Sequence, residues 1–168
     1  MVGRGKIKKE LSRLDYLYKK SQQSKITIEN RDSAFFAKLY LIEICGWIEE
    51  YMDYVIDVLK KKVSKERCNL DYIEKVKSNN FSFDYDHFLR MLIACIGIYG
   101  VERLESKIKD KTLNSFKSSL SVLKKSRDDH AHSFISGTTK KIHAPSFITP
   151  HFLNILSGLE LFMVEIRK

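Results

Sequence analysis

One short polar segment holds the densest group of chemically active side chains in the sequence. Within six residues it contains one guanidinium, two carboxylates and two imidazoles, at Arg127, Asp128, Asp129, His130 and His132. Histidine titrates near neutral pH and can move a proton during a reaction, and the planar fork of arginine binds a phosphate through two hydrogen bonds. These residue types therefore indicate proton transfer beside a bound phosphate group.

The segment lies at the end of a predicted helix. Apolar residues precede it at helical spacing, at Leu113, Phe116, Leu120 and Leu123, and Arg127 follows four residues later on the same stripe. The stripe faces the protein interior, and a buried cation without a partner is costly. We therefore expect Arg127 to meet a carboxylate, a phosphate or a partner subunit.

Two histidines are close enough in sequence to act with this arginine. Residues five apart on a straight helix diverge by roughly 140°, so His132 shares a site with Arg127 only if the helix ends or distorts across residues 128–131. His130 is three residues from Arg127 and faces the same way more easily. Plain helix geometry therefore favours His130, and His132 stays open if the helix ends or distorts.

The segment matches no common metal or nucleophile pattern. Together with His143 and His151 it offers metal-ligand types, but no HExxH or Cys/His zinc spacing organises them. Ser126 and Ser133 lack the glycine-framed turn that exposes a catalytic serine, and the chain contains no glycine-rich phosphate loop. We expect neither a metal nor a cofactor.

The arrangement Arg127-x4-His132, with a polar residue directly after the arginine and Ala131 directly before the histidine, resembles the motif of HEPN-domain ribonucleases. The resemblance is to small stand-alone members of that family. It implies a compact helical bundle, often dimeric, with a toxin or phage-defence role. It also implies that Arg127 and His132 are the catalytic pair. The supporting residues would be Asp128, Asp129 and His130.

The family pattern further places an acidic or polar residue of an early helix beside the motif arginine. Glu49 and Glu50 are the candidates in this sequence. Basic residues of the first helical segment and of the segment after the motif are expected to bind RNA: Lys8, Lys9, Lys140, Lys141 and His143.

The chain is strongly basic. It has 30 lysines and arginines against 21 aspartates and glutamates, a formal net charge of +9 and a pI near 9.4. Such a balance favours a polyanionic partner, and we expect nucleic acid, although charge alone does not separate RNA, DNA and anionic membrane. With 168 residues, 43% of them hydrophobic, residues 1–168 can form one domain with a real core.

The cysteines and the N-terminal residues indicate the cellular compartment in which the protein works. Cys45, Cys68 and Cys95 are odd in number and far apart, so neither a disulfide framework nor a zinc site is predicted. The first 18 residues are basic and amphipathic without a continuous apolar run, so no signal peptide is expected. These features predict a cytoplasmic protein.

Apolar spacing predicts helices over residues 6–23, 33–62, 88–101 and 112–131, a short helix over residues 70–77 and a last helix beginning at Thr149 and Pro150. The second of these would span roughly 45 Å, as either the central helix of a bundle or part of a dimer interface. The nearly all-apolar segment 88–101 should be the most enclosed. The predicted fold is an all-α, HEPN-like bundle of about five helices.

These expectations combine into a mechanism. The ribose 2′-hydroxyl is an internal nucleophile in RNA, so a histidine and an arginine suffice in kind for cleavage without a metal. We expect an endoribonuclease, working as a homodimer away from membranes, that leaves 2′,3′-cyclic phosphate and 5′-hydroxyl ends, with a cognate antitoxin protein as a further partner. The alternative is a non-catalytic HEPN-type module that binds RNA, a nucleotide or a protein.

Overall fold

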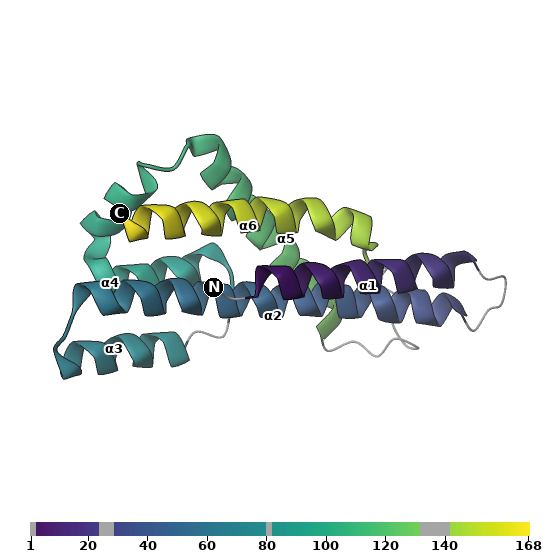
Figure 1. The fold of residues 1–168 in the computed structure, drawn as a ribbon, viewed down its shortest axis with the longest axis horizontal. Helices are drawn as coiled ribbons and strands as arrows, with labels where there is room; N and C mark the ends of the chain where they lie inside the picture. The colour runs from purple at the N-terminus through teal and green to yellow at the C-terminus, as the bar shows by residue number, and fades with distance from the viewer. Residues whose placement is uncertain (1–2, 24–28, 80–81, 132–141) are drawn as a thin grey trace.

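A computed structural model describes residues 3–23, 29–79, 82–131 and 142–168; within helices it leaves the side chains of residues 29–31 and 131 undescribed. The described residues form six α-helices and no strand: α1 (Arg4–Gln23), α2 (Glu29–Val63), α3 (Arg67–Ser78), α4 (Tyr85–Glu105), α5 (Asp110–Ala131) and α6 (Pro145–Arg167) (Figure 1). The predicted all-α bundle is confirmed, with six helices in this part of the chain where about five were expected.

The long helix α2 is the centre of the bundle. It packs against all five other helices, and Figure 1 shows α1 and α6 lying along it. Its predicted apolar stripe is fully interior, since Leu41, Ile44, Ile48 and Val55 are 0% exposed and Met52 is 1% exposed. Of the two roles considered for this helix, the structure supports the central one, and the stripe is not available as a dimer interface.

The first helix is amphipathic and pairs with α2. Ile7, Leu11 and Leu14 are its buried residues, and they pack into the same core as α2. Lys8 and Lys9 are exposed on its outer side. The helical spacing of three apolar residues among charged ones is therefore enough to explain why this segment folds against α2.

Helix α5, which carries Arg127, closely approaches α6. Phe116 of α5 and Phe162 of α6 are fully buried, and their ring centroids lie 5.8 Å apart. Phe88 of α4 completes this cluster, 5.4 Å from the ring of Phe162. A side chain at Gly158 would collide with Phe116, so glycine at this position permits the short distance between the two helices.

Helix α4 begins at a carboxylate that caps it. Asp84 is its N-cap and accepts a hydrogen bond of 2.9 Å from the backbone N–H of His87. The same carboxylate lies 2.5 Å from His87 Nδ1 and 3.0 Å from Lys124 Nζ of α5. Burial works to raise the pKa of Asp84, but the hydrogen bonds from His87 and Lys124 outweigh it and hold that pKa well below its usual range.

The expectation that residues 88–101 form the most enclosed helix is wrong. Gly97 has φ +68° and ψ 171°, a conformation that only glycine adopts without strain, and it kinks α4. Beyond the kink Ile98 is 65% and Tyr99 is 77% exposed. The segment is apolar as expected, but the change of direction at Gly97 turns Ile98 and Tyr99 outward, while Val101 beyond them is buried again.

The last helix begins earlier than predicted. Ala144 is its N-cap and Pro145 lies in its first turn, whereas Pro150 is inside the helix. The hydroxyl of Thr149 donates to the carbonyl of Pro145 at 2.7 Å, so Thr149 does not cap the helix. The chain contains two prolines. Pro150 follows a residue that could cap, whereas Pro145 follows Ala144, which makes no side-chain cap hydrogen bond; nevertheless Pro145 marks the true start, because proline suits the first turn of a helix.

Helix α6 is, among the described residues, the one helix long and apolar enough to cross a membrane. Its apolar side, including Ile155, Leu159 and Phe162, is buried within the bundle. The core helix of a soluble protein has the same properties, and the structure is compatible with a soluble protein.

Candidate functional site

Arg127 lies where α5 meets α2, under an aromatic ring. Its Nη1 is 2.7 Å from Oε1 of Glu49 on α2, and its Nε and Nη2 lie 3.1 and 3.0 Å from Oδ1 of Asp128. Its guanidinium carbon is 4.9 Å from the ring centroid of the fully buried Phe83. The side chain is 20% exposed. The inward stripe of α5 therefore places the guanidinium of Arg127 in a partly buried position. A partly buried cation needs a carboxylate beside it, and Glu49 supplies one from another helix.

The electrostatics of this pair are dominated by burial. Burial raises the pKa of Glu49, and the charge and hydrogen bond of Arg127 offset part of that shift. Cys45, one turn earlier on α2, is buried, and burial raises the pKa of its thiol to about 12 although the charge of Arg127 works against the shift. The thiol is thus neutral at physiological pH and is no nucleophile.

Glu50 does not belong to this site. It lines a groove between α1 and α2 with Lys6 and Glu10. Successive residues of a helix point about 100° apart, so Glu49 faces α5 and the adjacent Glu50 faces α1. Of these two glutamates, Glu49 reaches the guanidinium, and Glu50 does not lie beside it.

The structure describes only one of the two histidines of the motif. Helix α5 extends to Ala131, and His130 is 2% exposed on its buried side. His132 lies outside the described residues, as do Lys140 and Lys141. Burial of His130 prevents it from touching a substrate in solution.

Beside the arginine lies an open hollow of about 450 Å³, which Asp129 also lines. Its charged and polar lining residues are Asp84, Asp86, Ser121, Lys124, Lys125, Asp128 and Asp129. Four carboxylates outnumber two lysines here, and Lys124 is paired with Asp84 at 3.0 Å. A phosphate is repelled on this side, so we expect a polyanion to approach Arg127 from elsewhere.

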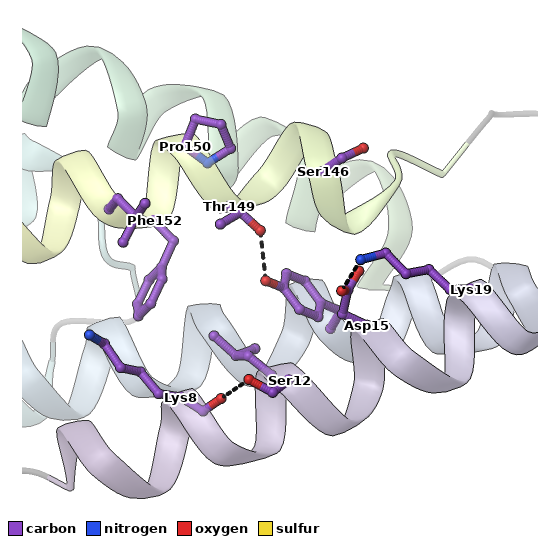
Figure 2. A pocket seen from close by; sticks show the side chains of 11 residues that line it. Lys8, Ser12, Asp15, Lys19, Ser146, Thr149, Pro150 and Phe152 are labelled. Carbon is purple, nitrogen blue, oxygen red and sulfur yellow. Dashed lines mark hydrogen bonds and ion pairs between the residues drawn. The ribbon is translucent and has the colours of Figure 1, made fainter.

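The groove between α1 and α2 has a volume of about 410 Å³ and does not adjoin Arg127. The larger groove of about 510 Å³ lies between α1 and α6, and Figure 2 shows Lys8, Asp15 and Lys19 of α1 facing Thr149 of α6 across it. Lys8 therefore lies in this groove and not beside Arg127.

The polar groups of the α1/α6 groove bond mainly to one another. Lys19 Nζ lies 2.6 Å from Asp15 Oδ2, and the hydroxyls of Tyr40 and Thr149 are 2.8 Å apart. Ser12 donates to the carbonyl of Lys8 at 2.8 Å. The groove has room for a ligand. Most of its polar groups already bond to one another, so few of them are free to take part in a reaction.

An aromatic column at the start of α6 was missed by the sequence prediction except for one member. The rings of His143 and Phe147 are stacked, with centroids 4.2 Å apart and an angle of 19° between their planes, and His151 follows 5.2 Å from Phe147. His151 Nδ1 lies 3.3 Å from the hydroxyl of Ser119 on α5. Aromatic residues at four-residue spacing were the available signal.

No group of three or more histidine, cysteine or acidic side chains gathers in a metal-binding arrangement within the described ranges. Across known proteins, no family model, curated protein or solved structure matches this chain. The helical bundle is therefore known from this structure alone, and the resemblance to HEPN ribonucleases rests on the motif residues.

Proposed function

We propose that this chain is a metal-independent endoribonuclease with a HEPN-type active site. The observation that supports this best is the partly buried guanidinium of Arg127, anchored at 2.7 Å by Glu49 from another helix. A guanidinium carries five N–H groups, so N–H groups remain for phosphoryl oxygens while the carboxylates hold its plane. Preorganised donors of this kind stabilise charge that develops in a transition state.

The burial of His130 supports His132 as the proton-transfer residue. An imidazole that is 2% exposed cannot reach a scissile phosphate, which leaves His132 as the remaining histidine of the motif. In the proposed step the 2′-hydroxyl loses its proton to His132 and its oxygen attacks the adjacent phosphorus. The bond to the 5′-oxygen breaks, that oxygen takes up a proton from water, and Arg127 binds the phosphoryl oxygens. The products are a 2′,3′-cyclic phosphate and a 5′-hydroxyl, and no metal is needed.

Cleavage of a labelled RNA in EDTA tests this proposal. Arg127→Ala and His132→Ala should each lower the rate by about 10²–10⁴, and RNA with 2′-deoxyribose at the scissile position should resist. Arg103→Ala is the matched control, because Arg103 is an exposed arginine on α4. Loss of cleavage in EDTA, or full activity of Arg127→Ala, contradicts the mechanism.

His130→Ala separates the two histidines. Because His130 is buried, its substitution should lower the melting temperature while the rate per folded molecule stays close to that of the wild type. A folded His130→Ala protein that has lost cleavage, together with an active His132→Ala protein, would assign the catalytic role to His130 instead.

The same proposal includes a homodimer, in which a two-fold axis sets two motifs side by side. The stripe of α2 is interior and gives this no support, so the case rests on the family resemblance. Light scattering decides it: a single species near the chain mass of 19.7 kDa at micromolar concentration contradicts a dimer.

RNA is the proposed partner, together with a cognate antitoxin protein, in a cytoplasmic toxin or phage-defence role. The exposed Lys8, Lys9 and His143, with Lys140 and Lys141, are the proposed contacts to the RNA backbone. Binding through such residues falls steeply as salt is raised. An affinity that is unchanged between low and high salt would count against them.

A non-catalytic module that binds a nucleotide is the second candidate, and the α1/α6 groove favours it. Its volume of about 510 Å³ lies within the range of small-molecule sites, and Lys8 and Lys19 are two cations on its α1 side (Figure 2). A thermal shift with nucleotides that Lys8→Ala abolishes, in a protein that does not cleave RNA, would select this function.

A further inference from the structure

The column formed by His143, Phe147 and His151 is exposed where a core residue would be covered. Phe147 is 43% exposed and His143 is exposed, although the next apolar residue of α6, Ile148, is 0% exposed. These rings therefore add little to the core. His143 and Phe147 each cover one face of the other, and His151 is half-buried and tilted by 60° to Phe147, so the column offers solvent mainly the ring of His143 and the edge of Phe147.

The column and the candidate active site lie toward the same end of the contact between α5 and α6. Phe116 of α5 meets Gly158 of α6, and Ser119 meets His151, so the two helices run in opposite directions, and Figure 1 shows that α5 crosses α6 obliquely. Moving from His151 back to the start of α6 thus follows α5 from Ser119 toward its C-terminal end. Arg127 lies eight residues beyond Ser119, a rise of roughly 12 Å along the helix.

Polar groups border the column at its inner end. The side-chain amide of Asn154 donates to the hydroxyl of Ser119 at 3.2 Å, and His151 Nδ1 lies 3.3 Å from that same hydroxyl. Amide, hydroxyl and imidazole groups supply both donors and acceptors. Ser119 is 1% exposed, so among these groups the exposed side-chain amide of Asn154 is the one that could bond to the edge of a base stacked on the rings.

The charge around the column suits a polyanion. No acidic residue occurs in the sequence between Asp129 and Glu160, and the first turn of α6 contains none. The hollow on the other side of α5 is lined by four carboxylates. A negatively charged strand is therefore favoured on the α6 side of Arg127 and disfavoured on the opposite side.

We propose that His143, Phe147 and His151 form a platform on which unpaired bases of single-stranded RNA stack on their way to Arg127. This inference rests on the proposed function for the identity of its ligand. Base stacking on aromatic rings tolerates any sequence, because every base has a flat face. Stacking also requires unpaired bases, so the platform selects single strands and rejects duplexes.

The test is binding of a fluorescent single-stranded oligonucleotide made of 2′-deoxyribose, which lacks the nucleophile and cannot be cleaved. Phe147→Ala should weaken binding roughly 5- to 150-fold, and Phe147→Trp should retain it, with tryptophan fluorescence quenched by the bound strand. Phe35→Ala is the matched control, because Phe35 is a phenylalanine of similar exposure, 50%, on α2. Duplex binding should be unchanged in all three variants.

The outcomes separate this proposal from the enzyme. Loss of single-strand binding in Phe147→Ala, with no RNA cleavage by the wild type, keeps the platform and rejects the ribonuclease. Wild-type affinity in Phe147→Ala overturns the platform whether or not RNA is cleaved. Equal losses for single strand and duplex, or an equal loss in Phe35→Ala, also overturn it, since neither pattern is expected from stacking at this column.

Discussion

Substituting Gly158 by alanine tests the packing that brings α5 and α6 together. An alanine Cβ at this position would lie 2.5, 2.6 and 2.8 Å from Cδ2, Cγ and Cβ of Phe116. Phe116 is 0% exposed, and the rings of Tyr85, Phe88 and Phe162 pack around it. Its Cβ is attached to the backbone of α5, so the collision is relieved only if the two helices move apart.

Two opposing effects set the size of the change. Alanine in place of glycine inside a helix gains about 0.8–1.0 kcal/mol in propensity, whereas overpacking a core typically costs 1–3 kcal/mol. Three contacts below 3.0 Å with a ring that cannot rotate away place the cost near the upper end. We expect a net destabilisation of about 1–2 kcal/mol.

Thermal unfolding of the two matched variants Gly158→Ala and Gly46→Ala is the assay. Gly46 also lies inside a helix, but a Cβ there has no atom within 4 Å, so only the propensity gain applies. For a chain of this size about 1 kcal/mol corresponds to about 2–4 °C in melting temperature. Gly158→Ala should therefore melt roughly 2–8 °C below the wild type, and Gly46→Ala about 2–4 °C above it.

The sign of the change in melting temperature tests the packing of α5 against α6. A Gly158→Ala protein that melts at or above the wild-type temperature would refute the close approach of α5 and α6. A Gly46→Ala protein destabilised to the same extent would show that loss of glycine, and not the lack of space beside Phe116, is responsible.

Two further predictions concern titration. The pKa of Asp84 is lowered in the folded state, so its stabilising contribution is present above the unfolded pKa of about 3.9 and is lost as pH falls below it. Asp84→Asn should therefore cost roughly 1.5–3 kcal/mol at pH 7, and denaturant unfolding at about pH 3 should show a smaller difference from the wild type; an equal difference at both pH values would contradict the ionic origin. Among the three cysteines, Cys68 is exposed, while burial raises the pKa of Cys45 to about 12 and that of Cys95 to about 11. A disulfide reagent at pH 8 should thus find one fast thiol, which Cys68→Ser removes; a second fast thiol in that variant would refute the assigned burial.

The sequence by itself determined the fold class and the type of partner that Arg127 needs. Helical apolar spacing is a local property, so the stripes of α1, α2 and α5 could be read from the chain. The position of Arg127 on an inward stripe was sufficient to predict a countercharge, because a buried cation without one is costly. The roles of Arg127 and His132 in cleavage remain predictions.

Only the tertiary structure decided which residues meet. It selected Glu49 over Glu50 at Arg127, because the rotation of α2 against α5 is set by packing across the whole core. It turned Ile98 and Tyr99 outward at Gly97, which hydropathy could not reveal because it records composition and not chain direction. It also placed His143, Phe147 and His151 beside Ser119, since the contact between α5 and α6 joins residues far apart in the sequence.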